Sequence, residues 1–427
     1  MTLRTRFDDF TWLCRGLALA AVERVETGVV FNPMAPGFRE DPYPFYRRLR
    51  ETDPFHRSRP ADGYVLTRYD DVIAVLRDSA FSSDERNLKI FPRMVARMAR
   101  AGLPDPYADD NMSMLRRDPP DHTRLRGLVA KAFTPRSIER MRPRIEQILK
   151  ELLDPRPAHG AMELVRELGA PLPVRVIAEM LGIPPEDHVR FRHWSNEIVR
   201  SLGEGTFEDQ RAALKAQGEL RSYFEAIVAA RRMAPRDDLI SALAAAEDAG
   251  DRLKASEMFA TLVLLLIAGN ETTTNLISNA MLALLRSPDQ LELLRASPER
   301  VPAALEELLR YDSPVQMTSR IATRDCELSG HQVRRGQQLV LLLGAANRDP
   351  EVFADPERLD VTRTDVRHLS FSHGIHFCLG AQLARLEGAL ALEALITRFP
   401  AIRLPAQKLT WRNNTILRGP TELWLEL

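Results

Sequence analysis

The segment FSHGIHFCLG, residues 371–380, places two histidines and one cysteine directly before a long apolar stretch. Three kinds of chemistry fit these residue types. A lone cysteine is often a buried and inert side chain. His373, His376 and Cys378 could instead bind a metal ion such as zinc, or Cys378 could bind a haem iron as a thiolate. The segment alone does not choose among these alternatives.

The chain has three cysteines, Cys14, Cys326 and Cys378. An odd number of widely separated cysteines is not a disulfide framework and is typical of proteins in a reducing cytosol. No CxxC or CxxCH motif accompanies them, which argues against a structural zinc site and against covalently attached haem. We therefore expect a cytoplasmic protein.

A second unusual segment is LVLLLIAGNETTTNLI, residues 262–277. The surrounding pattern predicts a helix from an N-cap at Ser256 to about Arg286, and residues 262–267 are apolar on every side, as in a core helix. Glu271 interrupts this pattern, and a buried carboxylate is costly unless it is paired, hydrated or used in chemistry. The interruption indicates either a locally opened helix beside a polar pocket or a polar surface patch on an ordinary helix.

The elements that must position these two segments are mostly helices. Residues 81–120 have only a weak pattern, and no Gly/Ser-rich linker divides the chain. The sequence therefore predicts one large, mainly α domain with a small β-rich part. Periodicity and turn residues predict helices over 45–51, 70–78, 121–286, 298–310 and 379–399, and strands over 63–69, within 325–341 and near the C-terminus.

The composition narrows the class of protein. Among 427 residues, 59 are basic and 59 acidic, and this balance argues against a protein that binds nucleic acid. Near the N-terminus, the uninterrupted apolar run 16–22 is far shorter than the ~20 residues of a membrane span, and it lacks a signal-peptide cleavage site. We expect residues 1–30 to be an extension, as an amphipathic helix packed on the body or as a weak membrane contact, and residues 31–427 to be the main domain.

Four motifs, taken together, resemble the cytochrome P450 superfamily. AGNETT, residues 268–273, resembles its oxygen-activation motif, and EELLR, with Glu307 and Arg310, resembles its ExxR motif. ADPERLD, with Arg358, resembles the segment that supplies the third member of that motif. The segment 371–380 resembles the haem-binding signature through Phe371, Gly374, His376, Cys378 and Gly380. The resemblance extends from about residue 31 to the C-terminus and implies the mainly α fold of this family.

The resemblance implies a haem b whose iron is bound by the Cys378 thiolate, the ligation that characterises this family. The residue types suit that role, because the two glycines allow close approach to a flat macrocycle, and Cys378 directly precedes a helix whose N-terminal N–H groups stabilise a thiolate. The resemblance also implies a structural triad under the haem, made of Glu307, Arg310 and Arg358. The side chains expected to contact the haem propionates are His122, Arg126, Arg320 and His376. Ala268 is expected to lie beside the haem.

As a function, the resemblance implies a monooxygenase that inserts one oxygen atom of O2 into a hydrophobic small molecule. Thr272 would hydrogen-bond the bound oxygen, and Glu271 would relay protons to it. A peroxide-driven hydroxylase and a non-enzymatic haem sensor or carrier are the alternatives. No GxGxxG dinucleotide motif is evident, so electrons should come from separate proteins, a ferredoxin and its reductase.

The substrate and the redox partner are the least defined parts of this prediction. Arg124, Lys131 and Arg367 could steer an acidic partner. The side chains expected to form the pocket wall are all apolar, which favours a hydrophobic substrate. They are Met112, Met114, Leu265, Val315, Met317, Ile416 and Leu417. One departure from the family pattern is Ser372, which stands where glycine is common.

Overall fold

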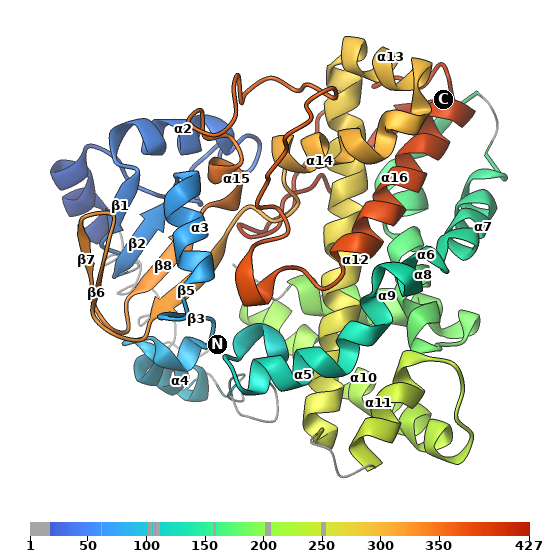
Figure 1. Ribbon diagram of the computed structural model, residues 1–427, viewed down its shortest axis with the longest axis horizontal. Coiled ribbons are helices and arrows are strands. Elements are labelled where there is room, and N and C mark those ends of the chain that lie inside the picture. The colour runs from blue at the N-terminus through green and yellow to red at the C-terminus, as the bar shows by residue number, and fades with distance from the viewer. Residues whose placement is uncertain are drawn as a thin grey trace.

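The computed structural model describes residues 18–427 apart from 61, 101, 103–104, 106, 108–111, 157–158, 201–205 and 249–252. A helical region and a smaller sheet region lie side by side, and the long helix α12 (Ala255–Arg286) runs through the helical region (Figure 1). The mainly α fold with a small β-rich part is thus confirmed.

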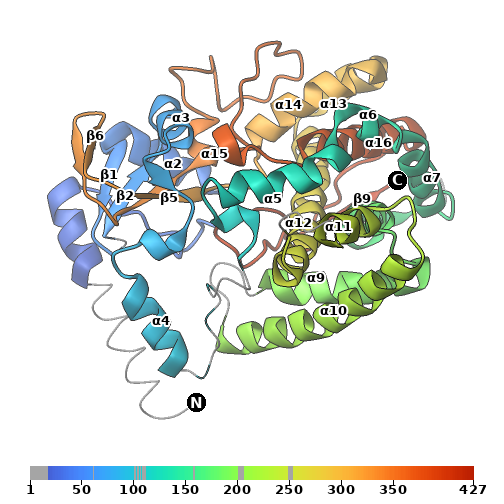
Figure 2. The ribbon, with the colours of Figure 1, turned by 60° about the horizontal axis from the view of Figure 1, so that its bottom comes forward.

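The helices before α12 cover it on several sides, and α10 lies along one edge of the helical region beside α9 (Figure 2). A π-helical turn, Val165–Gly169, directly precedes α8. In chain order these helices are α2 (Tyr43–Thr52), α3 (Tyr69–Arg77), α4 (Phe91–Arg100), α5 (Asp121–Ala130), α6 (Pro135–Glu139), α7 (Arg142–Leu153), α8 (Pro171–Leu181), α9 (His188–Arg200), α10 (Phe207–Met233) and α11 (Leu239–Asp248).

Four α-helices follow α12. Proline occupies the first turn of α13 and of α14, where its missing N–H has no helical partner to lose. The helix α16 lies beside α12 (Figure 1), and Gly388 allows this close packing because a Cβ there would lie 3.1 Å from Leu276 of α12. These helices are α13 (Pro288–Ala296), α14 (Val301–Tyr311), α15 (Leu343–Ala346) and α16 (Ala381–Arg398).

The main sheet combines strands from two distant parts of the sequence, in the order β1-β2-β8-β5-β3. β2 and β8 are parallel, and the other neighbours are antiparallel. Its strands are β1 (Phe55–Ser58), β2 (Gly63–Leu66), β3 (Phe81–Ser82), β5 (Thr318–Ala322) and β8 (Gln338–Leu341). Two further pairs are β4 (Ala161–Glu163) with β9 (Trp424–Glu426), and β6 (Cys326–Leu328) with β7 (His331–Val333).

The helix α12 is unbroken, so the locally opened helix that the sequence suggested is not observed. The hydroxyl of Thr272 donates to the carbonyl of Ala268 at 2.7 Å, and that of Thr274 donates to the carbonyl of Asn270 at 3.0 Å. Among the described helices, α12 alone is long and apolar enough to cross a membrane, but 67% of its most apolar window is buried, as in a core helix.

The N-terminal region packs on the sheet through one buried carboxylate. Residues 18–27 are helical, whereas residues 1–17, including Cys14, lie outside the described part of the chain. Glu23 accepts a hydrogen bond from the backbone N–H of Arg59 at 2.7 Å and contacts Nε2 of His56 at 2.8 Å. The extension is therefore attached to β1 by polar contacts as well as by packing.

Candidate functional site

The cysteine loop is shaped by backbone conformations that few side chains tolerate. Gly374 has φ +71°, and a Cβ there would lie 2.3 Å from the carbonyl oxygen of Leu76, so only glycine fits. Ser372 has φ +62° in the same left-handed region, which explains why glycine is common at this position in the family that the sequence resembles. The amide N–H of Cys378 donates to the carbonyl of Phe371 at 2.9 Å, which closes the loop directly before α16.

An ion-pair network behind the loop orients Phe371. Arg385 of α16 lies over the Phe371 ring, 4.6 Å from its centroid, and donates to both carboxylate oxygens of Glu306 at 2.7 and 2.8 Å. His368 contacts the same carboxylate at 3.1 Å. Although burial raises the pKa of Glu306, the bonds from Arg385 and His368 dominate and lower it to about 2. The loop is thus tied to α14 and α16 by a permanently charged pair.

Cys378 has accessible surface but lies among protein atoms, and removal from bulk water raises the pKa of its thiol. The Gly380 amide and the fields of Arg126 and Arg385 act in the opposite direction. Within the described residues, no three His, Cys, Asp or Glu side chains are placed to hold a metal ion. The zinc alternative built on His373, His376 and Cys378 therefore lacks its geometry.

Four basic side chains gather next to Cys378. The rings of His122 and His376 lie 4.4 Å apart between centroids, and Nη2 of Arg126 donates to the carbonyl of Phe377 at 2.7 Å. Arg320 is buried on β5. Burial and the fields of the other three groups lower the pKa of His376 to about 3, and burial lowers that of Arg320 to about 10.

This basic cluster is only weakly compensated, since Asp118 is the one described acid whose field acts on His122 and Arg320. Across the described ranges, none of the four side chains forms an ion pair, and both ring nitrogens of His122 and Nε2 of His376 are buried without a hydrogen-bond partner. Orphaned buried polar atoms beside positive charge call for an anionic ligand. A haem fits this set of donors, because it carries two propionates and an iron that a thiolate can bind.

The polar part of α12 carries the expected acid and threonine. Thr272 is half-buried and Ala268, one turn earlier, is exposed, although neighbouring residues of the helix are buried. The Glu271 side chain is only 4% exposed, and its Oε1 lies 2.6 Å from Nε of Arg412. Burial raises the pKa of Glu271, and Arg412 acts to lower it, with burial dominant.

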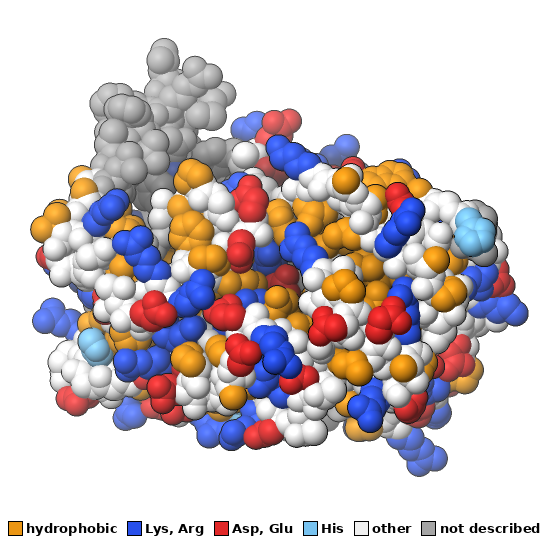
Figure 3. All heavy atoms as spheres, turned by 90° about the horizontal axis from the view of Figure 1, so that it is seen from above, with side chains coloured by type: hydrophobic (Ala, Val, Ile, Leu, Met, Phe, Trp, Pro, Cys, Tyr) orange, Lys and Arg blue, Asp and Glu red, His pale blue; other side chains and the backbone are white. Residues whose placement is uncertain are grey.

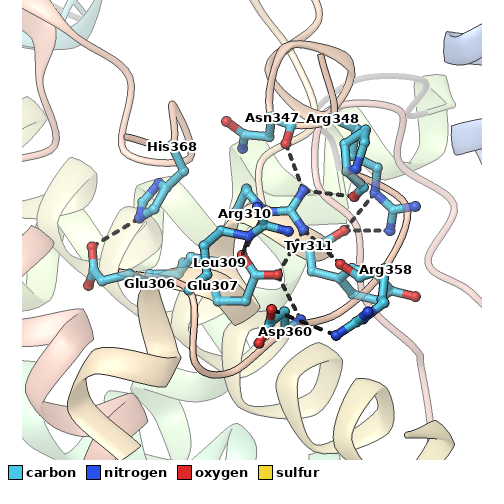
Figure 4. Close-up of polar contacts among 12 residues, drawn as sticks. Glu306, Glu307, Leu309, Arg310, Tyr311, Asn347, Arg348, Arg358, Asp360 and His368 are labelled. Atoms are coloured by element: carbon cyan, nitrogen blue, oxygen red, sulfur yellow. Dashed lines mark hydrogen bonds and ion pairs between the residues drawn. The ribbon is translucent and has the colours of Figure 1, made fainter. Parts of the chain in front are cut away.

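The Glu307–Arg310 pair is fully buried in α14. Arg310 donates to the Glu307 carboxylate through Nε at 2.6 Å and Nη2 at 2.8 Å, and its remaining N–H groups reach the carbonyls of Asn347, Pro356 and Arg358 (Figure 4). The pairing expected from the sequence is thus present, together with backbone partners that hold the segment leading to the cysteine loop.

Arg358 was expected to be the third side chain of this cluster, and that prediction is wrong. Its side chain is 65% exposed and approaches Asp360 at 3.8 Å, and only its backbone carbonyl reaches Arg310 (Figure 4). Arg363 takes the place instead, with Nε 3.1 Å from Oε2 of Glu307. The loop geometry, which brings residue 363 back toward α14, decides between the two arginines.

The residues predicted for the substrate wall do not form one set. Val315 and Leu417 lie side by side as a bridge pair, and Met112 is buried. Met114 and Leu265 belong to the large helical core, and Ile416 is exposed. Met317 belongs to a smaller core cluster that also contains Tyr43 and Tyr46 of α2, and its place in the substrate wall stays a prediction.

The basic residues suggested for partner steering are mostly compensated. Arg124 pairs with Glu257 at 2.6 Å and with Asp121 at 3.0 Å, so it is not a free surface charge. Arg367 approaches Asp365 at 3.3 Å, and Lys131 is exposed. On the face shown in Figure 3, basic and acidic side chains are interspersed, which agrees with the balanced composition.

Sequence reasoning missed several side chains that shape this site. They join segments distant along the chain, and no local pattern identifies them. A buried acid within the apolar helix α16 is the one exception, since Glu387 interrupts the run of apolar residues there. Burial alone raises the pKa of Glu387 to about 8. The missed residues are Glu306, Arg363, His368, Arg385, Glu387 and Arg412.

Comparison with known proteins gives consistent results. The family model described as "Cytochrome P450" matches residues 299–425. The chain is 41% identical over 410 residues to the polyketide biosynthesis cytochrome P450 PksS of Bacillus subtilis, covering 93% of this chain and 99% of the relative. It is 41% identical over 401 residues to 6-deoxyerythronolide B hydroxylase of Saccharopolyspora erythraea, covering 91% and 97%.

Solved structures agree. P450BioI, in complex with acyl carrier protein carrying hexadec-9Z-enoic acid, superposes with a TM-score of 0.83 at 35% identity, covering 92% of this chain and all of that one. Both the sequence and the fold of this chain are therefore similar to those of cytochrome P450 enzymes.

Proposed function

This chain belongs to the cytochrome P450 family of monooxygenases, and we propose that it inserts one oxygen atom of O2 into a hydrophobic small molecule, with electrons from separate redox proteins. The observation that carries the proposal is the position of Cys378 beside four basic side chains that form no ion pair among the described residues.

We assign the cofactor contacts to these residues. Cys378 binds the iron as a thiolate, favoured by the Gly380 amide and by the positive charges of Arg126 and Arg385. His122, Arg126, Arg320 and His376 hold the propionates, and Phe371, Gly374, Gly380 and Ala268 line the haem. When bound, the haem supplies the redox chemistry that activates dioxygen.

Thr272 and Glu271 of α12 would handle protons. The Thr272 hydroxyl now donates to the Ala268 carbonyl, and its lone pairs remain free to accept a hydrogen bond from water. Glu271 is a buried carboxyl whose pKa is raised by burial, and a carboxyl group can both hold and release a proton, as a proton relay requires. Glu307, Arg310 and Arg363 hold in place the segment that leads to the cysteine loop.

We propose that the electron donor is a ferredoxin, reduced by its own reductase, in the cytoplasm. Two apolar side chains of the cysteine loop support a docking surface there, since Ile375 is 49% exposed and Phe377 is 40% exposed. Lys131 adds a positive charge. Because Arg124 and Arg367 have acidic neighbours, we assign them no part in this contact.

A hydrophobic substrate agrees with the apolar residues predicted for the wall, Met112, Met114, Leu265, Val315 and Leu417. Two of the relatives suggest which compounds to examine first: 6-deoxyerythronolide B, and hexadec-9-enoic acid either free or attached to acyl carrier protein. A change of haem spin state on addition of each compound identifies those that bind near the iron.

Turnover under labelled dioxygen tests the proposal. The purified protein, a ferredoxin, its reductase and NADPH are incubated with each binding compound under 18O2. We expect product with one 18O atom and a large loss of product in Thr272→Ala. Product formed from hydrogen peroxide but not from O2 would indicate a peroxide-driven hydroxylase. Binding without product under either condition would indicate a haem sensor or carrier.

A further inference from the structure

A surface arginine far along the chain contacts the acid of α12. Nε of Arg412 lies 2.6 Å from Oε1 of Glu271, whose side chain is 4% exposed, whereas that of Arg412 is 27% exposed. Arg412 belongs to the C-terminal loop 411–419 and lines a narrow surface cleft together with Phe38, Arg39 and Trp411. The buried carboxylate is therefore one side chain away from solvent.

The loop 411–419 is held tightly against α12. The amide N–H of Arg412 donates to the Gly419 carbonyl at 3.1 Å, and its Nε donates to Oδ1 of Asn275 at 3.2 Å. Gly419 is required for this approach, because a Cβ there would lie 2.1 Å from Oδ1 of Asn275. Arg412 is thus fixed by contacts that do not depend on Glu271.

Three polar residues of α12 face this loop. Glu271, Asn275 and Asn279 are spaced by four residues and therefore share one helix face. Nδ2 of Asn279 donates to the Arg418 carbonyl at 3.0 Å, one turn beyond the contact between Arg412 and Asn275. The carboxylate is thus the first member of a polar row that runs beneath the loop.

Each residue of this row has a buried polar atom without a protein hydrogen-bond partner: Oε1 of Glu271, Nδ2 of Asn275 and Oδ1 of Asn279. The Nε–H of Arg412 is directed at Asn275, so its contact with Glu271 is ionic and leaves Oε1 free to accept a hydrogen bond. Leaving such atoms unpaired is costly, and ordered water is the usual partner.

We propose that Arg412 is a positioning residue for Glu271, and that protons from solvent reach Glu271 beneath the loop 411–419. This inference rests on the proposed monooxygenase function. Arg412 itself gives up no proton, because a guanidinium stays charged in proteins. It holds the ionised carboxylate toward the cleft, where the carboxylate takes one proton from water.

Protonation then removes the attraction that holds Glu271 to Arg412. The neutral carboxyl is free to turn toward the side of Thr272, deliver the same proton there and return ionised to Arg412. One proton thus passes from solvent to the site in each cycle, and neither residue is changed. Besides Arg412, no described charged group acts on Glu271, and Glu387 of the neighbouring α16 responds to burial alone.

An infrared titration tests the coupling without turnover. The carbonyl band of protonated Glu271 is identified in the holoprotein as the band lost in Glu271→Gln. Its midpoint should rise by about one pH unit or more in Arg412→Gln, since an opposite charge in contact favours ionisation. Arg412→Lys should restore most of the wild-type midpoint. An unchanged midpoint in Arg412→Gln would overturn the proposal.

Turnover provides the second measurement. In Arg412→Gln, the amount of product formed per NADPH consumed should fall several-fold. The solvent isotope effect on the turnover rate should rise, because proton delivery becomes rate-limiting. The double variant with Glu271→Gln should be no worse than Glu271→Gln alone, because residues acting as a unit are not additive. The matched control is Arg403→Gln, an arginine of the C-terminal region that is 76% exposed and pairs with Glu426.

The two proposals can fail separately. Additive effects of the Arg412 and Glu271 substitutions, or equal losses in Arg412→Gln and Arg403→Gln, would overturn the role of Arg412 while leaving the monooxygenase function intact. Absence of O2-dependent product in the wild-type protein would refute the proposed function, and the infrared midpoints would still decide whether Arg412 controls Glu271.

Discussion

Nε of Arg363 lies 3.1 Å from Oε2 of Glu307, a carboxylate with no exposed surface. Arg310 holds both oxygens of the same carboxylate, so two guanidinium groups compensate one buried charge. Arg363 also donates to the carbonyl of Ala354 at 3.0 Å. It therefore fastens the loop before the cysteine segment to α14.

Replacing Arg363 by alanine should destabilise the protein by roughly 1–3 kcal/mol, because it removes an ion pair with a buried acid that still retains Arg310, together with the hydrogen bond to the Ala354 carbonyl. Arg358→Ala is the matched control and should stay within about 0.5 kcal/mol, since its exposed side chain is lost but its backbone carbonyl remains. Denaturant unfolding of the two holoproteins measures the difference. A larger loss in Arg358→Ala would contradict the assignment.

Ser372→Gly should stabilise the cysteine loop. Serine at φ +62° carries a left-handed strain of about 1–2 kcal/mol, and its buried hydroxyl lacks a partner. Glycine removes both costs, but its more flexible unfolded chain destabilises the folded protein by roughly 0.5–1 kcal/mol. A small net rise in melting temperature is therefore expected. Ser329→Gly, at φ +49° in the β6–β7 turn, relieves the same kind of strain but also loses the hydrogen bond from the Ser329 hydroxyl to Asp71, so its gain should be smaller. A lower melting temperature in Ser372→Gly would show that the serine is used.

Arg320→Ala should weaken cofactor binding. Arg320 is buried and forms no ion pair among the described side chains, although the field of Asp118 reaches it, so its charge is available to a propionate. Loss of a charged hydrogen bond, about 1.5–3 kcal/mol, corresponds to roughly a 10- to 100-fold faster loss of haem. Transfer of haem to excess apomyoglobin measures this rate. Arg334→Ala, an exposed site after β7, should leave it unchanged; equal rates in the two variants would contradict the contact.

Glu387 makes stability depend on pH. The pKa of Glu387 in the folded protein, about 8, lies above its value in the unfolded chain. The free energy of unfolding is therefore highest below about pH 4.5, where the acid is neutral in both states, and it falls as the pH rises through about 8. Glu387→Gln should remove this loss and raise the free energy of unfolding at pH 8.5 by a few kcal/mol. Unfolding curves at pH 6 and pH 8.5 test this. Parallel pH dependence in the wild type and the variant would show that the acid is ionised without penalty.

Local motifs carried most of the prediction of the fold and the site. α12 and α16 have long apolar patterns that depend little on the rest of the chain, and their observed bounds lie within a few residues of those expected. In contrast, α4 was not predicted, because prolines and glycines nearby weaken the pattern over 81–120. The N-cap of α12 is Lys254 rather than Ser256, a small difference of the kind common at helix ends.

The tertiary contacts of the site could not be predicted in the same way. Arg358 and Arg363 lie in one irregular loop, and only the folded path of that loop shows which side chain returns to Glu307. Arg412 reaches Glu271 from a segment without periodicity.

The most direct test of the account is the absorption spectrum of the reduced protein exposed to carbon monoxide, recorded for the wild type and for Cys378→Ser. We predict a strongly red-shifted Soret band in the wild type, the mark of a thiolate ligand, and its loss in the variant. A wild-type band at the position given by histidine or a neutral thiol, or a red-shifted band that survives in Cys378→Ser, would contradict the assignment of Cys378 as the haem ligand.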